Sequence, residues 1–282
     1  MSHSAYSQLN VVTTTGMIAD LVSNIGGKHV AVTALMSTGV DPHLYKATQG
    51  DLRRLSNADI IFYNGLHLEG KMQDIFNKLA RKKAVYAVAE KIAPTSLIQH
   101  GQHPDPHIWF DLSLWQQAGN HVLEALIEQD PSHKSDYQKQ ANNYLNEMQK
   151  LNQWVVQQIQ NVPQKQRILI TAHDAFGYFG KAYDIKVMGL QGISTAAEFG
   201  LQDIKNLKDV IVQNRVKAVF VESSVSPRFI ESLVAGVKAE GHNIVIGGEL
   251  YSDAMGPVGT PTDNYFGMVK HNVKTIVKAL KD

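Results

Sequence analysis

The longest regular pattern in the chain is an amphipathic segment between Pro131 and Pro163. No glycine or proline interrupts it, and its apolar residues recur at the spacing of one helix face. These residues are Tyr137, Ala141, Tyr144, Leu145, Met148, Leu151, Trp154, Val155 and Ile159. The opposite face carries Gln, Asn and Lys, so the segment is not a membrane span. The pattern predicts one helix over residues 131–163, about 45 Å long, that joins two halves of similar size; the alternative is an ordinary packing helix inside one large domain.

Both flanks of this helix show short apolar segments that alternate with amphipathic ones. Strands are expected over residues 9–14, 30–36, 59–63 and 84–88, and after the long helix over 167–172, 185–188, 217–221 and 243–247. Helices are expected over 17–25, 49–58, 71–81, 113–128, 176–179, 201–213, 227–240 and 265–280, and a loop over 97–111. We therefore predict an α/β fold of two domains, each with a four-stranded parallel sheet flanked by helices, joined by one long spine helix. The predicted divisions are residues 8–130, 131–163 and 164–282.

The composition limits the class of protein. Of the 282 residues, 44% are hydrophobic and 19% are charged, the net charge is +1, and no dense block of Lys or Arg stands out. We therefore expect no nucleic-acid partner. No apolar run approaches the roughly 20 residues that cross a bilayer, and the absence of cysteine excludes thiolate metal sites, thiol catalysis and disulfides. The first residues lack the basic and apolar parts of a secretory signal, which fits either a mature exported chain or a cytosolic one.

Four residue positions suggest a metal site at one edge of the predicted sheets. His43 follows the second strand, and His107 lies in the loop after the fourth. His173 follows the first strand after the long helix, and Asp253 follows the last strand. Open parallel sheets bind ligands beyond the carboxyl ends of their strands. Three imidazoles and a carboxylate suit zinc or manganese, and two come from each half, so only a cleft between the halves would complete this set.

Other histidines near this edge are weaker candidates. A single loop histidine is usually a surface residue, but Asp-Pro-His occurs at 41–43 and again at 105–107. In both places the proline stiffens the chain before the imidazole. His100 and His103 lie close to the same edge and are possible accessory ligands.

Three glutamates also lie near strand ends. Glu198 and Glu222 are candidates for fixing the tautomers of the ligating imidazoles. The alternative for both is a salt bridge with Arg228 or a lysine, and this alternative is favoured for Glu249.

The chain has no G-x-S-x-G, H-E-x-x-H or P-loop motif. Instead it resembles the metal-binding solute-binding proteins of ABC transporters, most closely the zinc/manganese TroA type. The segments that carry the resemblance are GVDPHLYKATQGDLRRLSNADIIFYNGLHLE, PDPHIWFDLSLW, TAHDAFGYFGKAYD, VFVESSVSPR and GGELYSDAMGP. They occur in the family's order, and the resemblance runs from Leu9 to the last helix.

The resemblance implies a metal held between the two domains by His43, His107, His173 and Asp253. It implies a receptor, not an enzyme, that captures a divalent metal outside the cytoplasm and hands it to an ABC permease. Such proteins are periplasmic or lipid-anchored outside the membrane. This chain, without a signal or a lipobox cysteine, would be a processed form, and we expect a monomer.

The same resemblance bears on the choice of metal. Many manganese members have Glu where this chain has His173, so the His-rich set favours zinc without excluding manganese. Many zinc members carry a long His-rich loop before the second ligand, which is reduced here to His100-Gly-Gln-His103. Around Glu198 the chain reads AEFG, where relatives often have other small residues or proline.

Two other functions fit the same four residues. A zinc hydrolase would also need an open coordination position and a general base near the metal-bound water, and no acidic residue is positioned for that as clearly as the four ligands are. A surface adhesin would use the metal only to hold its fold. For the receptor, we expect the spine helix to limit hinge bending, so that closure is a small tilt with local ordering of loops.

Overall fold

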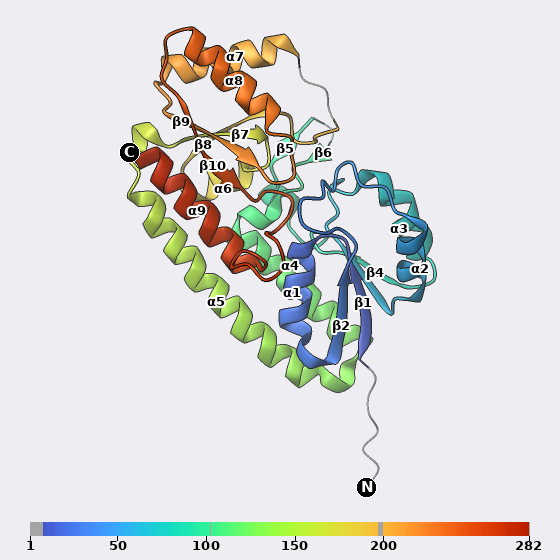
Figure 1. Ribbon diagram of the computed structural model, residues 1–282. Coiled ribbons are helices and arrows are strands. Elements are labelled where there is room, and N and C mark those ends of the chain that lie inside the picture. The colour runs from blue at the N-terminus through green and yellow to red at the C-terminus, as the bar shows by residue number, and fades with distance from the viewer. Residues whose placement is uncertain (1–7, 102, 197–199, 282) are drawn as a thin grey trace.

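Two α/β halves lie along one long helix in the computed structural model, which describes residues 8–101, 103–196 and 200–281 (Figure 1). The long helix is α5 (Lys134–Gln160), with 27 residues. A 3-10 turn, Pro131–His133, precedes it, and Pro163 lies just beyond its end, so the predicted helix is confirmed with its outermost residues in turns. Within the described residues, none of the helices has the length and apolar character needed to cross a lipid bilayer.

The first half contains the predicted four-stranded parallel sheet. Its order is β2-β1-β3-β4, from β1 (Leu9–Thr13), β2 (Val30–Ala34), β3 (Ile60–Tyr63) and β4 (Ala84–Ala87). The helices of this half are α1 (Gly16–Gly26), α2 (Gln49–Asn57), α3 (Gln73–Leu79) and α4 (Leu112–Gln129). Successive strand residues face opposite sides of a sheet. Val11 accordingly joins the core beneath α1 and α4, and Val12 joins a second core beneath α2 and α3.

The second half contains the four predicted parallel strands as two hydrogen-bonded pairs. β7 (Ile168–His173) pairs with β8 (Lys186–Gln191), and β9 (Ala218–Glu222) pairs with β10 (Val245–Leu250). β7 lies beside β9, which gives the order β8-β7-β9-β10 (Figure 1). At the ends of these two central strands, the carboxylate of Glu222 in β9 accepts a hydrogen bond from the backbone N–H of His173 in β7, at 2.8 Å. A side-chain oxygen thus takes the place that a backbone carbonyl has in an ordinary pair of strands. The helices are α6 (Gly177–Tyr183), α7 (Leu201–Gln213), α8 (Arg228–Ala239) and α9 (Tyr265–Lys281).

Three local predictions are wrong. The strand expected over 185–188 continues to Gln191 in β8. The segment 97–111, expected to be a loop, contains a short antiparallel hairpin of β5 (Gln99–His100) and β6 (His103–Pro104), with Gly101 in the left-handed conformation between them. Strands of two residues are too short to show a period. The last strand was expected to end at Gly247, but it continues to Leu250, because its two glycines form a bulge inside the strand.

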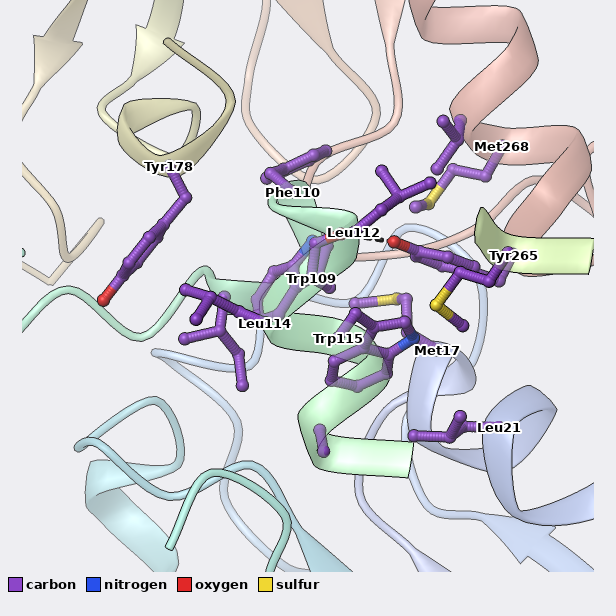
Figure 2. Close-up of a cluster of buried hydrophobic side chains, with 14 of the residues drawn as sticks. Met17, Leu21, Trp109, Phe110, Leu112, Leu114, Trp115, Tyr178, Tyr265 and Met268 are labelled. Atoms are coloured by element: carbon purple, nitrogen blue, oxygen red, sulfur yellow. Dashed lines mark hydrogen bonds between the residues drawn. The ribbon is translucent and has the colours of Figure 1, made fainter. Parts of the chain in front are cut away.

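One apolar core contains residues from both halves and from the long helix. Figure 2 shows the part of this core where α1, α4 and α9 meet. Trp109 and Trp115 are buried in it. Tyr265, at the start of α9, donates its hydroxyl to the carbonyl of Trp109 at 2.5 Å, and the Trp109 indole donates to the carbonyl of Ser252 at 3.0 Å. The first half is thus held to the second by buried hydrogen bonds as well as by apolar packing.

Replacing Tyr265 with phenylalanine tests this connection. The ring stays, but the buried carbonyl of Trp109 loses its donor, so we expect the free energy of unfolding to fall by about 1–2 kcal/mol. Denaturant unfolding of the metal-free protein measures this loss. Tyr86→Phe is the control, since its hydroxyl contacts the exposed side chain of Glu128. Equal stability of the two variants would contradict a structural role for the Tyr265 hydroxyl.

Candidate metal site

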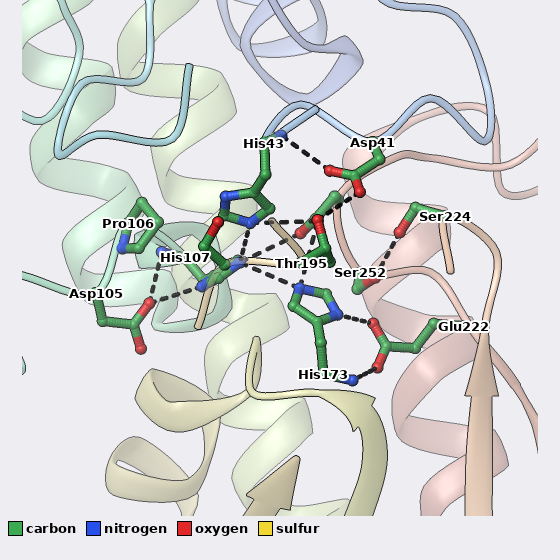
Figure 3. A network of polar contacts seen from close by, with 12 residues as sticks. Asp41, His43, Asp105, Pro106, His107, His173, Thr195, Glu222, Ser224 and Ser252 are labelled. Carbon is green, nitrogen blue, oxygen red and sulfur yellow. Dashed lines mark hydrogen bonds and ion pairs between the residues drawn. The ribbon is translucent and has the colours of Figure 1, made fainter. Parts of the chain in front are cut away.

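The structure brings the four predicted ligands together between the two halves. Figure 3 shows how the three histidines point toward one another. The Nε2 atom of His107 lies 3.3 Å from Nε2 of His43 and 3.4 Å from Nε2 of His173. Carboxylate oxygens of Asp253 lie 3.7 Å from His43 Nε2, 3.4 Å from His107 Nε2 and 3.3 Å from His173 Nε2. All four side chains are buried, and one donor atom of each lies within 4.8 Å of the others.

Four of these five distances are close to the edge length of a small coordination tetrahedron. Zinc–nitrogen bonds of about 2.0–2.1 Å in a tetrahedral shell require ligand atoms about 3.3 Å apart. Both oxygens of Asp253 are buried, and the three imidazoles form ion pairs with them. A buried carboxylate is costly unless it is paired with a positive charge. A cation between Asp253 and the imidazoles would remove this cost.

Two aspartates orient the histidines of the first half. The Oδ1 atom of Asp41 accepts the backbone N–H of His43, and Oδ1 of Asp105 accepts that of His107, each at 2.9 Å. The repeated Asp-Pro-His sequence therefore forms the same turn twice. Only the proline of this repeat was expected to matter, and the role of the two aspartates was not predicted, although the repeat itself was the available signal. The second oxygen of Asp41 also accepts the hydroxyl of Thr195 from the second half, at 2.5 Å (Figure 3).

Carboxylates also contact the Nδ1 atoms of two histidines. His107 Nδ1 lies 2.7 Å from Asp105 Oδ1, and His173 Nδ1 lies 2.6 Å from Glu222 Oε2. A carboxylate at Nδ1 directs Nε2 towards a metal and makes it a stronger donor. Glu222 pairs with His173 in the way considered from the sequence, and not with Arg228 or a lysine.

The remaining candidates lie apart from the four donor atoms. Glu198 is outside the described residues. Glu249 is exposed on β10, within the strand and not in the expected loop after it. His100 and His103 are exposed on the β5–β6 hairpin and line a cavity that also borders His43.

The protonation of the three imidazoles differs with their partners. Burial lowers the pKa of His43 to about 3, so this ligand is neutral. Burial also opposes protonation of His107, but Asp105 and Asp253 outweigh it and raise the pKa to about 9. Glu222 and Asp253 likewise raise the pKa of His173 well above its usual range, against the effect of burial. Burial opposes ionisation of Asp253, but His173 and His107 hold the pKa of this carboxyl well below its usual range.

Removing either carboxylate behind an imidazole is expected to weaken metal binding. For Asp105→Asn and for Glu222→Gln we expect zinc affinity, corrected for protonation of the imidazoles, to fall by about 10- to 100-fold, because each amide leaves the imidazole less basic and less firmly oriented. Competition with a chelator of known affinity measures this change. Asp184→Asn is the control, since that carboxylate is exposed and pairs with Arg167. Affinities equal to the control's would exclude an orienting role.

Two α/β halves on one long helix, with three imidazoles and a carboxylate gathered between them, define a metal receptor of the solute-binding class. The family model described as zinc-uptake complex component A, periplasmic (ZnuA), matches residues 11–279. This match covers nearly the whole chain, so the chain belongs to this family.

Individual relatives agree with the family assignment. The chain is 50% identical to the manganese-binding lipoprotein MntA of Bacillus subtilis (strain 168), over 99% of this chain and 92% of that protein. It is 46% identical to the zinc-binding protein TroA of Treponema pallidum (strain Nichols), over 96% of this chain and 88% of that protein. The solved structure of periplasmic zinc-binding TroA superposes with a TM-score of 0.96 at 45% identity, covering 98% of this chain and 100% of that one. The predicted fold class is therefore confirmed.

Proposed function

We propose that this protein is an extracytoplasmic receptor that binds one divalent transition metal, zinc or manganese, as its cargo. The ligands are His43, His107, His173 and Asp253. The observation that carries this proposal is the convergence of these four buried donor atoms, two from each half. Relatives named as zinc- and manganese-binding proteins support the choice of cargo.

The receptor delivers its metal to the membrane permease of an ABC transporter. Relatives named as metal ABC transporter lipoproteins support this partner and a location outside the cytoplasmic membrane, in the periplasm or on a lipid anchor. We propose that it acts as a monomer without nucleic acid. Residues 8–130 and 164–282 form the two metal-binding lobes, and residues 131–163 form the link between them.

Binding, and not catalysis, is the function that the site supports. A catalytic zinc keeps one coordination position open for water or substrate. Four buried protein donors converge here, enough to fill a four-coordinate shell without water. Such a shell leaves no coordination position for a substrate. An adhesin that needs the metal for folding is disfavoured by the apolar core, which connects both halves without the site's residues.

Zinc is expected to bind more tightly than manganese. Imidazole donors favour zinc over manganese in the general order of divalent metal affinities. His173 contributes a third imidazole, and the spacing suits a four-coordinate ion. Manganese, which commonly takes more oxygen ligands, is the second cargo.

Direct counting of bound ions tests the proposed function. Metal is removed, equal amounts of zinc and manganese are offered, the protein is desalted, and ions are counted by native mass spectrometry. We expect one ion per chain, mostly zinc, and its loss in His173→Ala but not in the control His242→Ala, whose ring contacts the Val216 carbonyl. A chain that retains no ion would rule out the site.

A further inference from the structure

A cavity of about 450 Å³ lies between helix α2 and the edge strand β2 of the first sheet. Thr33 of β2 pairs with Val12 of β1 and therefore faces the same side of the sheet. Val12 is buried there, whereas Thr33 is exposed, so α2 covers the central strand and leaves the edge strand open. Small-molecule sites typically have volumes of about 300–1,000 Å³. None of the four proposed metal ligands lines this cavity.

The side of α2 that borders the cavity is polar. Its lining residues recur at the spacing of one helix face, and they are Gly50, Arg53, Arg54 and Asn57. An amphipathic helix normally turns its apolar residues towards the sheet that it covers. Of the two leucines of α2, Leu55 is buried but Leu52 is exposed. Departures from the usual pattern are expected at functional sites.

The polar side chains around the cavity can all donate hydrogen bonds. Besides the two arginines, they are the amides of Asn10 and Asn57 and the hydroxyl of Thr33. Among the residues that the structure describes, no Asp or Glu lines the cavity. Its chemistry therefore suits an anion. A phosphate monoester has three acceptor oxygens and a carboxylate has two, so the phosphate uses more of these donors.

One of the two guanidinium groups is already fixed in place. Nη1 of Arg54 donates to Oδ1 of the buried Asp51 at 2.9 Å. The other oxygen of Asp51 accepts the backbone N–H of Thr48 at 2.8 Å, and the hydroxyls of Thr48 and Tyr45 at 2.7 Å each. Arg53 forms no ion pair with any residue in the described part of the chain. The cavity thus combines one oriented arginine with one that is available to a ligand.

We propose that this cavity binds the phosphate monoester group of a small organic ligand, with Arg53 and Arg54 as the residues that anchor it. An arginine can donate two parallel hydrogen bonds to phosphate oxygens. The rest of the ligand lies along Asn10, Thr33 and Asn57, whose amides and hydroxyl suit a polyol. A soluble glycerol or sugar phosphate and the headgroup of phosphatidic acid share this chemistry. The site goes beyond metal capture and does not depend on it.

Two probes and two variants of the full chain test this site. Calorimetry measures binding of glycerol 3-phosphate, with acetate for comparison, and co-sedimentation measures binding to phosphatidylcholine vesicles with and without phosphatidic acid. The variants are Arg53→Gln, which keeps the bond between Arg54 and Asp51, and Arg53→Gln/Arg54→Gln. The control Arg81→Gln/Lys82→Gln removes two adjacent exposed charges after α3, outside the cavity. Zinc binding is measured for each protein.

We expect the wild type and the control to bind at least one of the two phosphate probes, and to bind acetate more weakly. Arg53→Gln should weaken phosphate binding several-fold and the double variant at least about tenfold, with zinc binding unchanged. Binding of glycerol 3-phosphate assigns a soluble ligand to the site, and binding only to vesicles with phosphatidic acid assigns a lipid. Binding of neither probe overturns the proposal. An equal loss in the control and the double variant, or no loss in either, overturns it as well.

Discussion

Replacing Asp253 with asparagine is expected to lower zinc affinity by about 3–5 kcal/mol, roughly a hundredfold to a few thousandfold. Asp253 is the one carboxylate among the four donors, and it contacts all three imidazoles. The amide keeps the size of the side chain but removes the negative charge that stabilises a buried cation. Competition with a high-affinity chelator, at fixed pH and salt, measures the change.

The matched control for this variant is Asp209→Asn, which neutralises an exposed carboxylate on α7. It should bind zinc as the wild type does. Circular dichroism of both metal-free variants separates a loss of binding from a loss of fold. If Asp253→Asn folds and retains wild-type affinity, Asp253 is not a ligand and the proposed site is wrong.

Zinc affinity is also expected to fall about 100-fold for each unit of pH lost between about pH 8 and pH 6. The pKa of His107 is raised to about 9, and that of His173 is raised well above its usual range. In this interval both metal-free imidazoles carry a proton on Nε2 that zinc must displace, and each displaced proton contributes about tenfold per pH unit. His43, with a pKa of about 3, releases no proton.

Two measurements check this proton count. Chelator competition at several pH values gives the slope, after correction for protonation of the chelator. Calorimetry in buffers of different protonation enthalpy gives the protons released, expected to be two for each zinc ion. In Asp105→Asn the slope should fall towards one proton, because His107 loses the carboxylate that raises its pKa. An affinity independent of pH would show that the imidazoles are neutral before the metal binds.

The elements of this fold could be predicted because their signals are local. The apolar period of the segment between Pro131 and Pro163 identifies α5 without reference to any other part of the chain. The four ligand candidates were found from their positions after strands, since parallel strands bring their carboxyl ends to one edge. The order of residues along the chain was therefore enough to predict α5 and the four ligand candidates.

Other features depend on contacts that no local pattern records. Asp105 was missed because its role is defined by a contact with the Nδ1 atom of His107, which a sequence does not display. Glu69 holds the turn after β3 by accepting hydrogen bonds from the backbone N–H groups of Asn64 and Gly65. Its carboxylate also accepts a hydrogen bond from Thr14, 55 residues earlier in the chain. The pair Gly247-Gly248 is typical of a strand end, and only its pairing with β9 shows a bulge instead. Long-range packing decided each of these cases.

The packing of α9 has a consequence for the order in which the molecule folds. The Tyr265 ring lies 5.8 Å from that of Trp115 in α4, and Phe266 stacks on Tyr144 of α5 with 4.8 Å between centroids. Helix α9 therefore packs on residues that lie more than a hundred positions earlier in the chain. During synthesis, the first half therefore exposes an apolar surface to solvent until α9 packs on it. Native packing of this core is thus completed only after α9 has been synthesised.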